Sequence, residues 1–294
     1  MNDAKACILV TGGAGYIGSH TVMALTAAGY RVVVLDDLST GCNTLISKNI
    51  PSVIGDACDG NLVSQIIKDY AVTAVMHFAG SIFVEESIAN PLKYYSNNTE
   101  TSRRLIESCV ANRVTNFVFS STAAVYGEPD QIPITEDAGL APINPYGASK
   151  LMTERMLEDI GATGRLQFAI LRYFNVAGAD LEGRSGHIGH YSKHLIRVAI
   201  ETAIGLRSEI PIYGDDYKTP DGTCIRDFIH VTDLADAHVL ALQWLKNGQD
   251  NIILNCGYGR GSSVRQVLDS VERVSGNSLN VKIVARRKGD AARL

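Results

Sequence analysis

A glycine-rich turn near the amino terminus constrains the fold of this chain more than any other feature. Residues 11–18 read TGGAGYIG, between the apolar run at 6–11 and a helix-like stretch at about 16–28. Such glycines allow a tight turn and a close approach of the backbone to a pyrophosphate, and the helix that follows presents free N–H groups. The turn predicts a dinucleotide site, although a tight turn without a ligand is the alternative. The predicted cofactor contacts in it are Gly12, Gly15, Tyr16, Ile17 and Gly18.

An aspartate after the second apolar run indicates which dinucleotide binds. Asp36 follows the run at 31–35 and lies 18 residues after Gly18. A carboxylate at this place can bind the hydroxyls of the adenosine ribose, and it repels a 2′-phosphate. No arginine occurs in the loop at 37–40. The sequence therefore favours NAD over NADP.

Apolar runs alternate with helix-like stretches along the first 176 residues. Strands are expected at 6–11, 31–35, 72–78, 116–120 and 167–172, and helices at about 16–28, 61–70, 86–111 and 146–161. Near-continuous apolar runs are typical of parallel strands that are covered on both faces. We therefore expect an α/β fold, with a doubly wound parallel sheet (Rossmann) in 1–176 and a return segment at about 228–248. A smaller, mixed α/β domain for the substrate is expected from 177–227 and 249–294.

Composition and charge exclude several classes of partner. The chain has 294 residues, of which 46% are hydrophobic and 20% charged, and its formal net charge is −4. Without a long run of like charge, nucleic acid and anionic membranes are not expected as partners. The first apolar run is too short to span a membrane, and no basic leader with a cleavage site precedes it. Six scattered cysteines without a C-x-x-C pair indicate free thiols, so we expect a cytoplasmic protein.

A Tyr-x-x-x-Lys pattern supplies a candidate catalytic pair. In a helix, Tyr146 and Lys150 share one face. A tyrosine ordinarily titrates near pH 10, and a neighbouring cation lowers its pKa, so Tyr146 is predicted to act as a base on a sugar hydroxyl. Lys150 is also expected to hydrogen-bond the nicotinamide ribose. The pattern alone is frequent by chance, and the start of an ordinary amphipathic helix is the alternative. The upstream hydroxyl of Thr122 strengthens the catalytic interpretation.

Five motifs together resemble the extended short-chain dehydrogenase/reductase family, and within it the UDP-glucose 4-epimerases. The similarity extends over essentially the whole chain. The motifs are TGGAGYIGSH at 11–20, FVFSSTAAVYG at 117–127, YGASK at 146–150, LRYFN at 171–175 and RDFIHV at 226–231.

The resemblance implies inversion of C4 of a UDP-hexose, UDP-glucose or UDP-galactose, through a transient 4-keto sugar and enzyme-bound NADH. It implies that Tyr146 removes the proton of the 4-hydroxyl and that Thr122 hydrogen-bonds the reacting oxygen. A homodimer through the helices at 86–111 and 146–161 is also implied. Further cofactor contacts are expected at Asp56, Phe78, Ala79, Gly80, Asn98, Ser120 and Tyr173, and substrate contacts at Asn175, His194, Tyr213, Arg226, Arg287 and Asp290.

The sequence departs from the family pattern at several places. Ile82 stands where some members have a lysine on the cofactor diphosphate, and Phe228 replaces a tyrosine. Most members continue beyond the equivalent of Leu294, so we expect that a carboxy-terminal piece is missing. Leu294 also replaces a bulky aromatic residue of some members, which predicts tolerance of UDP-N-acetylhexosamines.

Two other functions and a metal site were weighed against the epimerase. A nucleotide-sugar dehydratase or decarboxylase is one alternative, but Ala123 and Ala124 stand where dehydratases carry an Asp-Glu pair, and methyl groups transfer no protons. The other alternative is a non-catalytic NAD-binding regulator, which would tend to lack the tyrosine or the lysine. His187, His190 and His194 have a metal-like spacing, but the neighbouring glycines indicate a loop and the segment contains no carboxylate, so no metal is expected.

Overall fold

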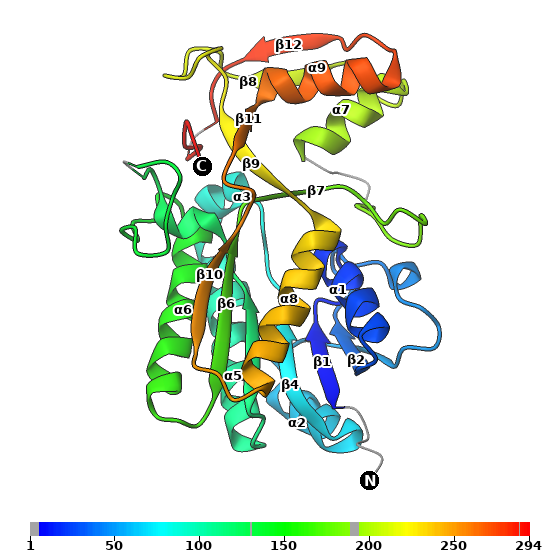
Figure 1. Cartoon of the computed structure of the whole chain (residues 1–294), viewed down its shortest axis with the longest axis vertical. Coiled ribbons are helices and arrows are strands. Elements are labelled where there is room, and N and C mark those ends of the chain that lie inside the picture. Colours follow the sequence, from blue (N-terminus) through cyan, green and yellow to red (C-terminus); the bar gives the residue numbers. More distant parts are fainter. Residues whose placement is uncertain (1–5, 130, 189–193, 288) are drawn as a thin grey trace.

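A parallel sheet forms the larger part of the molecule (Figure 1). The computed structural model describes residues 6–129, 131–188, 194–287 and 289–294. In these residues seven strands pair in the order β10-β6-β5-β4-β1-β2-β3, and every pair is parallel. The strands are β1 (Cys7–Thr11), β2 (Arg31–Asp36), β3 (Ser52–Ile54), β4 (Val72–His77), β5 (Asn116–Ser120), β6 (Gln167–Tyr173) and β10 (Ile252–Cys256).

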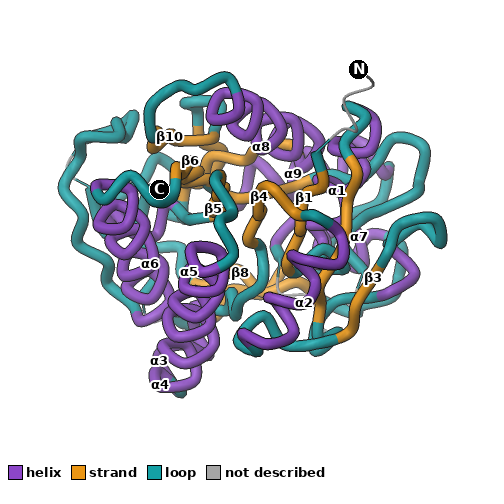
Figure 2. The backbone as a smooth tube through the Cα atoms, turned by 90° about the horizontal axis from the view of Figure 1, so that it is seen from below, coloured by secondary structure: helices purple, strands orange, loops and turns teal. Residues whose placement is uncertain are grey.

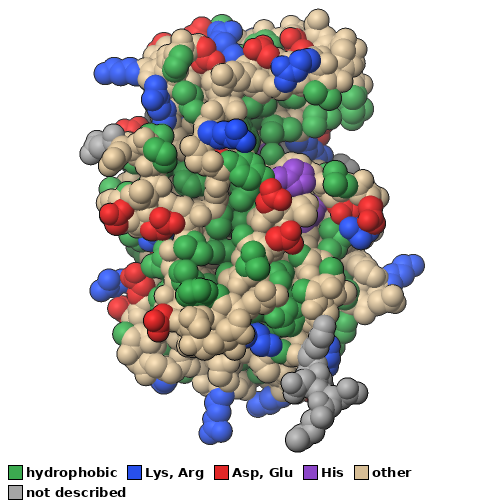
Figure 3. Space-filling view, in the orientation of Figure 1, with side chains coloured by type: hydrophobic (Ala, Val, Ile, Leu, Met, Phe, Trp, Pro, Cys, Tyr) green, Lys and Arg blue, Asp and Glu red, His purple; other side chains and the backbone are tan. Residues whose placement is uncertain are grey.

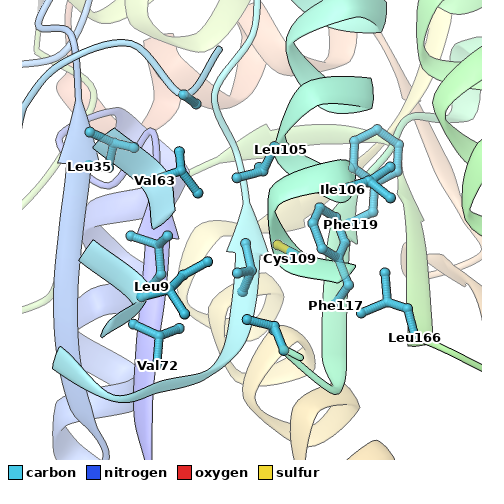
Figure 4. Packing of buried hydrophobic residues seen from close by; sticks show 14 of the residues in the cluster. Leu9, Leu35, Val63, Val72, Leu105, Ile106, Cys109, Phe117, Phe119 and Leu166 are labelled. Carbon is cyan, nitrogen blue, oxygen red and sulfur yellow. The ribbon is translucent and has the colours of Figure 1, made fainter. Parts of the chain in front are cut away.

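Helices cover both faces of this sheet (Figure 2). On one face α1 (Tyr16–Ala27) and α8 (Val231–Lys246) pack against each other and against the strands. On the other face lie α2 (Gly60–Tyr70), α5 (Thr101–Ala111) and α6 (Pro145–Ala162), and Figure 4 shows part of the apolar core beneath them. Burial on both faces explains why the strands read as continuous apolar runs. The expected doubly wound α/β fold is confirmed.

A smaller part lies beyond the carboxyl ends of the large sheet (Figure 1). Its strands form a three-stranded sheet, in the order β11-β9-β7, and a parallel pair of β8 and β12. The helices α7 and α9 close a small apolar core over that pair. The bounds are β7 (Asn175–Ala177), α7 (Leu195–Ala203), β8 (Ile210–Tyr213), β9 (Ile225–His230), β11 (Gly261–Ser263), α9 (Val264–Ser275) and β12 (Val281–Val284).

The return of the chain to the large sheet extends further than the sequence predicted. The expected helix is present as α8, but β10 follows it and pairs with β6 at the sheet edge. Residues 252–256 therefore lie in the large sheet. A parallel strand requires a crossover connection, and α8 is the part of the connection from β6 to β10 that packs on this sheet.

The single helix expected at 86–111 is interrupted. The structure has α3 (Val84–Ala89), α4 (Pro91–Tyr94), a π-helical segment (Tyr95–Glu100) and then α5. Pro91 occupies the first turn of α4, where its missing N–H is tolerated, and it prevents α3 from continuing. Two short 3₁₀ turns, at Asn43–Leu45 and Ala123–Tyr126, complete the elements. A search of the described helices found none with the length and apolar character of a membrane span.

Candidate active site

The glycine turn joins β1 to α1 with very little space around it. Gly12 has a φ of +71°, and a Cβ atom there would lie 2.5 Å from the backbone nitrogen of Ala79. A Cβ atom on Gly18 would overlap the carbonyl oxygen of Gly12, so helix and turn can approach this closely only with glycine. Among the described residues no side chain caps α1, whose N-cap residue is Gly15. The N–H groups around Tyr16 and Ile17 therefore suit an anion.

Asp36 is held at the end of β2 by two backbone donors. Its carboxylate accepts hydrogen bonds from the N–H groups of Ala14 and Leu38, each at 2.9 Å. Burial raises the pKa of this carboxyl group. A carboxylate offers about four acceptor positions, so two remain for ribose hydroxyls.

A hollow of about 90 Å³ lies beside Asp36 and the turn. Asp56 lines it and accepts a hydrogen bond from the N–H of Cys58 at 2.8 Å, whereas Asp59 is the residue that caps α2. The hollow thus collects half of the cofactor residues that the sequence predicted outside α1. The predicted residues that line it are Gly12, Asp36, Asp56, Phe78, Ala79 and Gly80.

The start of α6 buries the candidate catalytic pair. Asn144 caps the helix by accepting from the N–H of Gly147 at 2.9 Å, and Pro145 occupies the first turn. Tyr146 and Lys150 are 8% and 3% exposed, and Nζ of Lys150 donates to the carbonyl of Ser120 at 3.1 Å. Burial lowers the pKa of Lys150 to about 8.

The Thr122 hydroxyl interacts with the side chain of Tyr146 and lowers its pKa. Burial raises the pKa of Tyr146, and the interaction with Thr122 opposes this only in part. The expected lowering by Lys150 is therefore wrong for the protein by itself, because loss of hydration is the larger effect.

The other predicted residues around this pair hold neighbouring backbone segments. Ser120 Oγ donates to the hydroxyl of Tyr173 at 3.0 Å. Asn98, 1% exposed, accepts from the N–H of Ser81 at 2.7 Å and donates to the Ser81 carbonyl and the Ser149 hydroxyl, each at 3.0 Å. Asn98 thereby joins the loop after β4 to α6, and its side chain is engaged within the protein.

A cavity of about 710 Å³ lies between the large and small parts. It is in the size range of pockets for small molecules. On the face drawn in Figure 3, histidine side chains lie where the upper and lower parts meet. Six of the predicted substrate residues line the cavity, while Thr122 belongs to the neighbouring strand end. The six are Asn175, His194, Tyr213, Arg226, Arg287 and Asp290, and the two departures Ile82 and Phe228 line it as well.

The arginines of this cavity are arranged by aromatic and acidic neighbours. The Arg287 guanidinium lies 3.6 Å from the ring centroid of Tyr213, and its buried Nε has no hydrogen-bond partner among the described residues. Arg226 lies 3.9 Å from the carboxylate of Asp290 and donates to the Ala291 carbonyl at 2.7 Å. Both cations face a cavity large enough for an anionic ligand.

The histidines pack against the start of α1. The ring of His187 stacks on Tyr16 at 4.9 Å and meets His194 edge-on at 4.4 Å. Burial lowers the pKa of His187 to about 3 and also lowers that of His194. His190 lies outside the described residues, and in the described residues no three metal-ligating side chains come together. The expectation of no metal stays a prediction.

Sequence reasoning missed a buried ion pair behind the catalytic pair. Glu154 and Arg172 are separated by 2.7 Å, and both side chains are almost completely buried. Glu154 lies one helical turn beyond Lys150, so the helical spacing from Tyr146 was the signal that could have identified it. Its partner on β6 could not be inferred from spacing.

Comparison with known proteins decides the family. The model of the NAD-dependent epimerase/dehydratase family matches residues 8–257. The chain belongs to this family. Its sequence is 55% identical to that of a UDP-glucose 4-epimerase of Azospirillum brasilense over 297 residues. The match covers 100% of this chain and 85% of that protein.

Solved structures agree with the assignment of this family member. The UDP-glucose 4-epimerase from Brucella ovis in complex with NAD has a TM-score of 0.94 at 46% identity, with 98% of this chain and 89% of that chain covered. The UDP-Glc/GlcNAc 4-epimerase from Campylobacter jejuni has a TM-score of 0.83 at 45% identity over the same shares of both chains. The resemblance that the motifs carried, the enzyme class and NAD as cofactor are thus confirmed. The individual site residues and the domain limits remain predictions.

Proposed function

We propose that the chain is an NAD-dependent UDP-glucose 4-epimerase, which interconverts UDP-glucose and UDP-galactose by inverting C4 of the sugar. The observation that carries this proposal is the buried group of Tyr146, Lys150 and Thr122, in which Nζ of Lys150 donates to the carbonyl of Ser120 and the Thr122 hydroxyl acts on the pKa of Tyr146. Ser120 and Thr122 lie at the carboxyl end of β5, the edge at which parallel sheets bind their ligands.

The residues around the glycine turn fit NAD. The crowded Gly12 and Gly18 and the uncapped start of α1 suit its diphosphate, and the carboxylate of Asp36 retains acceptor positions for the adenosine ribose. Lys150 would bind the nicotinamide ribose. When bound, NAD would supply the hydride acceptor and donor that inversion at C4 of the sugar requires.

The chain's own groups handle the proton of the sugar 4-hydroxyl. The hydroxyls of Thr122 and Tyr146 interact, so both would reach the same substrate oxygen, from which Tyr146 would take the proton. Lys150 is a cation below about pH 8. Together with the pyridinium charge of bound NAD, its charge would offset the rise that burial causes in the pKa of Tyr146. The next two residues, Ala123 and Ala124, add no acid or base for an elimination of water.

The cavity between the two parts suits the UDP end of the substrate. Arg226 and Arg287 offer cationic donors for a diphosphate, and the unpartnered Nε of Arg287 needs an acceptor such as a phosphate oxygen. Asn175 lines the same cavity and adds a neutral polar group. A sugar nucleotide in it would extend toward Tyr146 in the first turn of α6.

Tolerance of UDP-N-acetylhexosamines is part of the proposal. Leu294 packs against the cluster of Ala123, Val125 and Tyr126 next to the catalytic strand end. A leucine there leaves more room than an aromatic ring, and the Campylobacter jejuni relative is a Glc/GlcNAc enzyme by name. Turnover of UDP-N-acetylgalactosamine at a rate comparable to UDP-galactose is expected, and Leu294→Tyr should reduce only the former. Negligible turnover of the acetylated sugar by the unmodified protein would contradict this part.

A homodimer in the cytoplasm completes the proposal. The predicted dimer contact lies on the helices at 86–111 and 146–161, which carry exposed apolar side chains: Leu92 is 80% and Met152 46% exposed. Covering such side chains in an interface is favourable because it removes apolar surface from water. All six cysteines have free thiols, as in a reducing compartment. Light scattering of the purified protein should give twice the mass of the chain. A monomeric mass would argue against the dimer.

The decisive test is a conversion without added cofactor. The purified protein is given UDP-galactose alone, and UDP-glucose should accumulate to an equilibrium without net change at the absorbance band of NADH. Release of NADH in proportion to product, or formation of a 4-keto-6-deoxy sugar, would contradict an epimerase.

A further inference from the structure

Three side chains of α6 meet three consecutive residues at the end of β5. Tyr146, Lys150 and Glu154 follow one another at intervals of four residues, so they share one helical face. Lys150 donates to the carbonyl of Ser120, and Glu154 accepts from the hydroxyl of Ser121. Tyr146 interacts with the Thr122 hydroxyl, which lowers its pKa. The helix that carries the base therefore also holds the strand end that carries its partner Thr122.

Glu154 is in turn fixed by Arg172 on β6. The Arg172 guanidinium donates to both carboxylate oxygens, from Nη2 at 2.7 Å and from Nε at 3.1 and 3.2 Å. Nη1 of Arg172 donates to the hydroxyl of Tyr126 at 2.9 Å, and Tyr126 donates to Asn255 on β10 at 2.7 Å. The ion pair thus contacts residues 121 and 126, which stand on either side of Thr122 and its two alanines.

We propose that the Glu154–Arg172 ion pair is a positioning device for the proposed epimerase reaction, acting through Ser121 and Tyr126 to hold Thr122 against Tyr146. This rests on the proposed function, since it concerns the same reacting oxygen. Glu154 and Arg172 are positioning residues and touch neither sugar nor cofactor.

Stability alone does not account for this arrangement. Removing two charges from water costs free energy, and their mutual attraction in the core does little more than offset that cost. Apolar residues of similar volume often stabilise a core equally well. What an apolar pair cannot do is bind a hydroxyl at each end of a short turn. The hydroxyl of Thr122 caps the turn at Ala123–Tyr126 by accepting from the N–H of Ala124 at 3.2 Å. Contacts at both of its ends restrict the movement of Thr122.

The test uses Ser121→Ala and Tyr126→Phe, because each cuts one link and leaves the ion pair intact. Removing a member of the ion pair itself would leave a buried charge unpaired and could prevent folding. The control is Ser108→Ala, a buried serine on α5 whose hydroxyl donates only to its own helix, at Arg104. For each protein we would measure kcat and KM for UDP-galactose, the amount of bound NAD and the melting temperature.

We expect kcat of Ser121→Ala to fall about tenfold, with KM, NAD content and melting temperature close to those of the parent protein, since a misplaced reacting group costs rate and not ground-state binding. Tyr126→Phe should show a smaller fall of the same kind, and Ser108→Ala none. A kcat within twofold of the parent for Ser121→Ala, or a raised KM at unchanged kcat, would overturn the inference. Failure of the parent protein to convert UDP-galactose would instead refute the proposed function, so the two failures are distinguishable.

Discussion

Replacement of Tyr146 by phenylalanine separates the catalytic role of this residue from its structural role. The side chain is 8% exposed and lies edge-on to Tyr94 with ring centroids 6.4 Å apart, and a phenyl ring keeps that packing. The loss is the interaction with the Thr122 hydroxyl, and a hydrogen bond is worth about 1 kcal/mol in a typical case. For a chain of this length that corresponds to a fall of roughly 2–4 °C in melting temperature.

The expected effect on catalysis is much larger. A positioned general base contributes about 10²- to 10⁴-fold, which is roughly 3–5 kcal/mol of activation free energy. Tyr146→Phe should therefore lose at least a hundredfold in kcat for UDP-galactose while it folds and retains NAD. The assay follows UDP-glucose formation, with NAD content measured after denaturation and melting measured in parallel. A variant with more than a tenth of the parent kcat would show that another group takes the proton.

Three other perturbations have expected outcomes that follow from the same structure. Lys150→Met should abolish activity yet raise stability at pH 7 by up to about 3 kcal/mol, because the folded protein lowers the pKa of Lys150 from 10.5 to about 8 and so disfavours its charged form. Between pH 8 and 10.5 the unfolded parent chain binds one proton more than the folded protein does, so the parent gains stability as the pH rises through that range. Denaturant titrations should therefore show that the difference in free energy of unfolding between variant and parent shrinks as the pH rises. A constant difference would contradict this cause. Gly18→Ala should release bound NAD, as a methyl group there meets the Gly12 carbonyl, whereas Gly139→Ala, which has open space around it, should retain it; equal NAD content in both would refute the crowding argument. The free energy of unfolding in urea should fall as the pH drops from 6.5 toward 4. Burial holds the pKa of His77 at about 3 and that of His238 at about 4, so the unfolded chain takes up protons before the folded protein does. His77→Phe should make the free energy of unfolding less dependent on pH, and an unchanged dependence would exclude His77 as a cause.

The positions of the strands and of the glycine turn were predictable because they depend on local patterns. Apolar runs with glycine punctuation identify β1, β2, β4, β5 and β6 to within a residue or two. The edge strand β10 was missed because its unbroken apolar run, IIL, is only three residues long. One of these three residues is exposed, as at the edge of a sheet. The interruption at Pro91 was missed because the amphipathic pattern continues on both sides of it.

The sequence by itself determined the glycine turn and the placing of Tyr146 and Lys150 on one face of a helix. Helical periodicity places Tyr146 and Lys150 on one face whatever the rest of the chain does, and glycine alone accommodates the turn at 12–18. These are short-range geometric constraints, so they can be read without knowing the fold.

Only the tertiary structure decided how the site is assembled and charged. Arg226 and Asp290 come within 3.9 Å, and Glu154 meets Arg172, through crossovers that no spacing in the chain encodes. The pKa of Tyr146 rises, against expectation, because burial is a property of everything packed around a residue and not of its neighbours in sequence. Motifs therefore name the reacting groups, while packing sets their environment and the strength of each interaction.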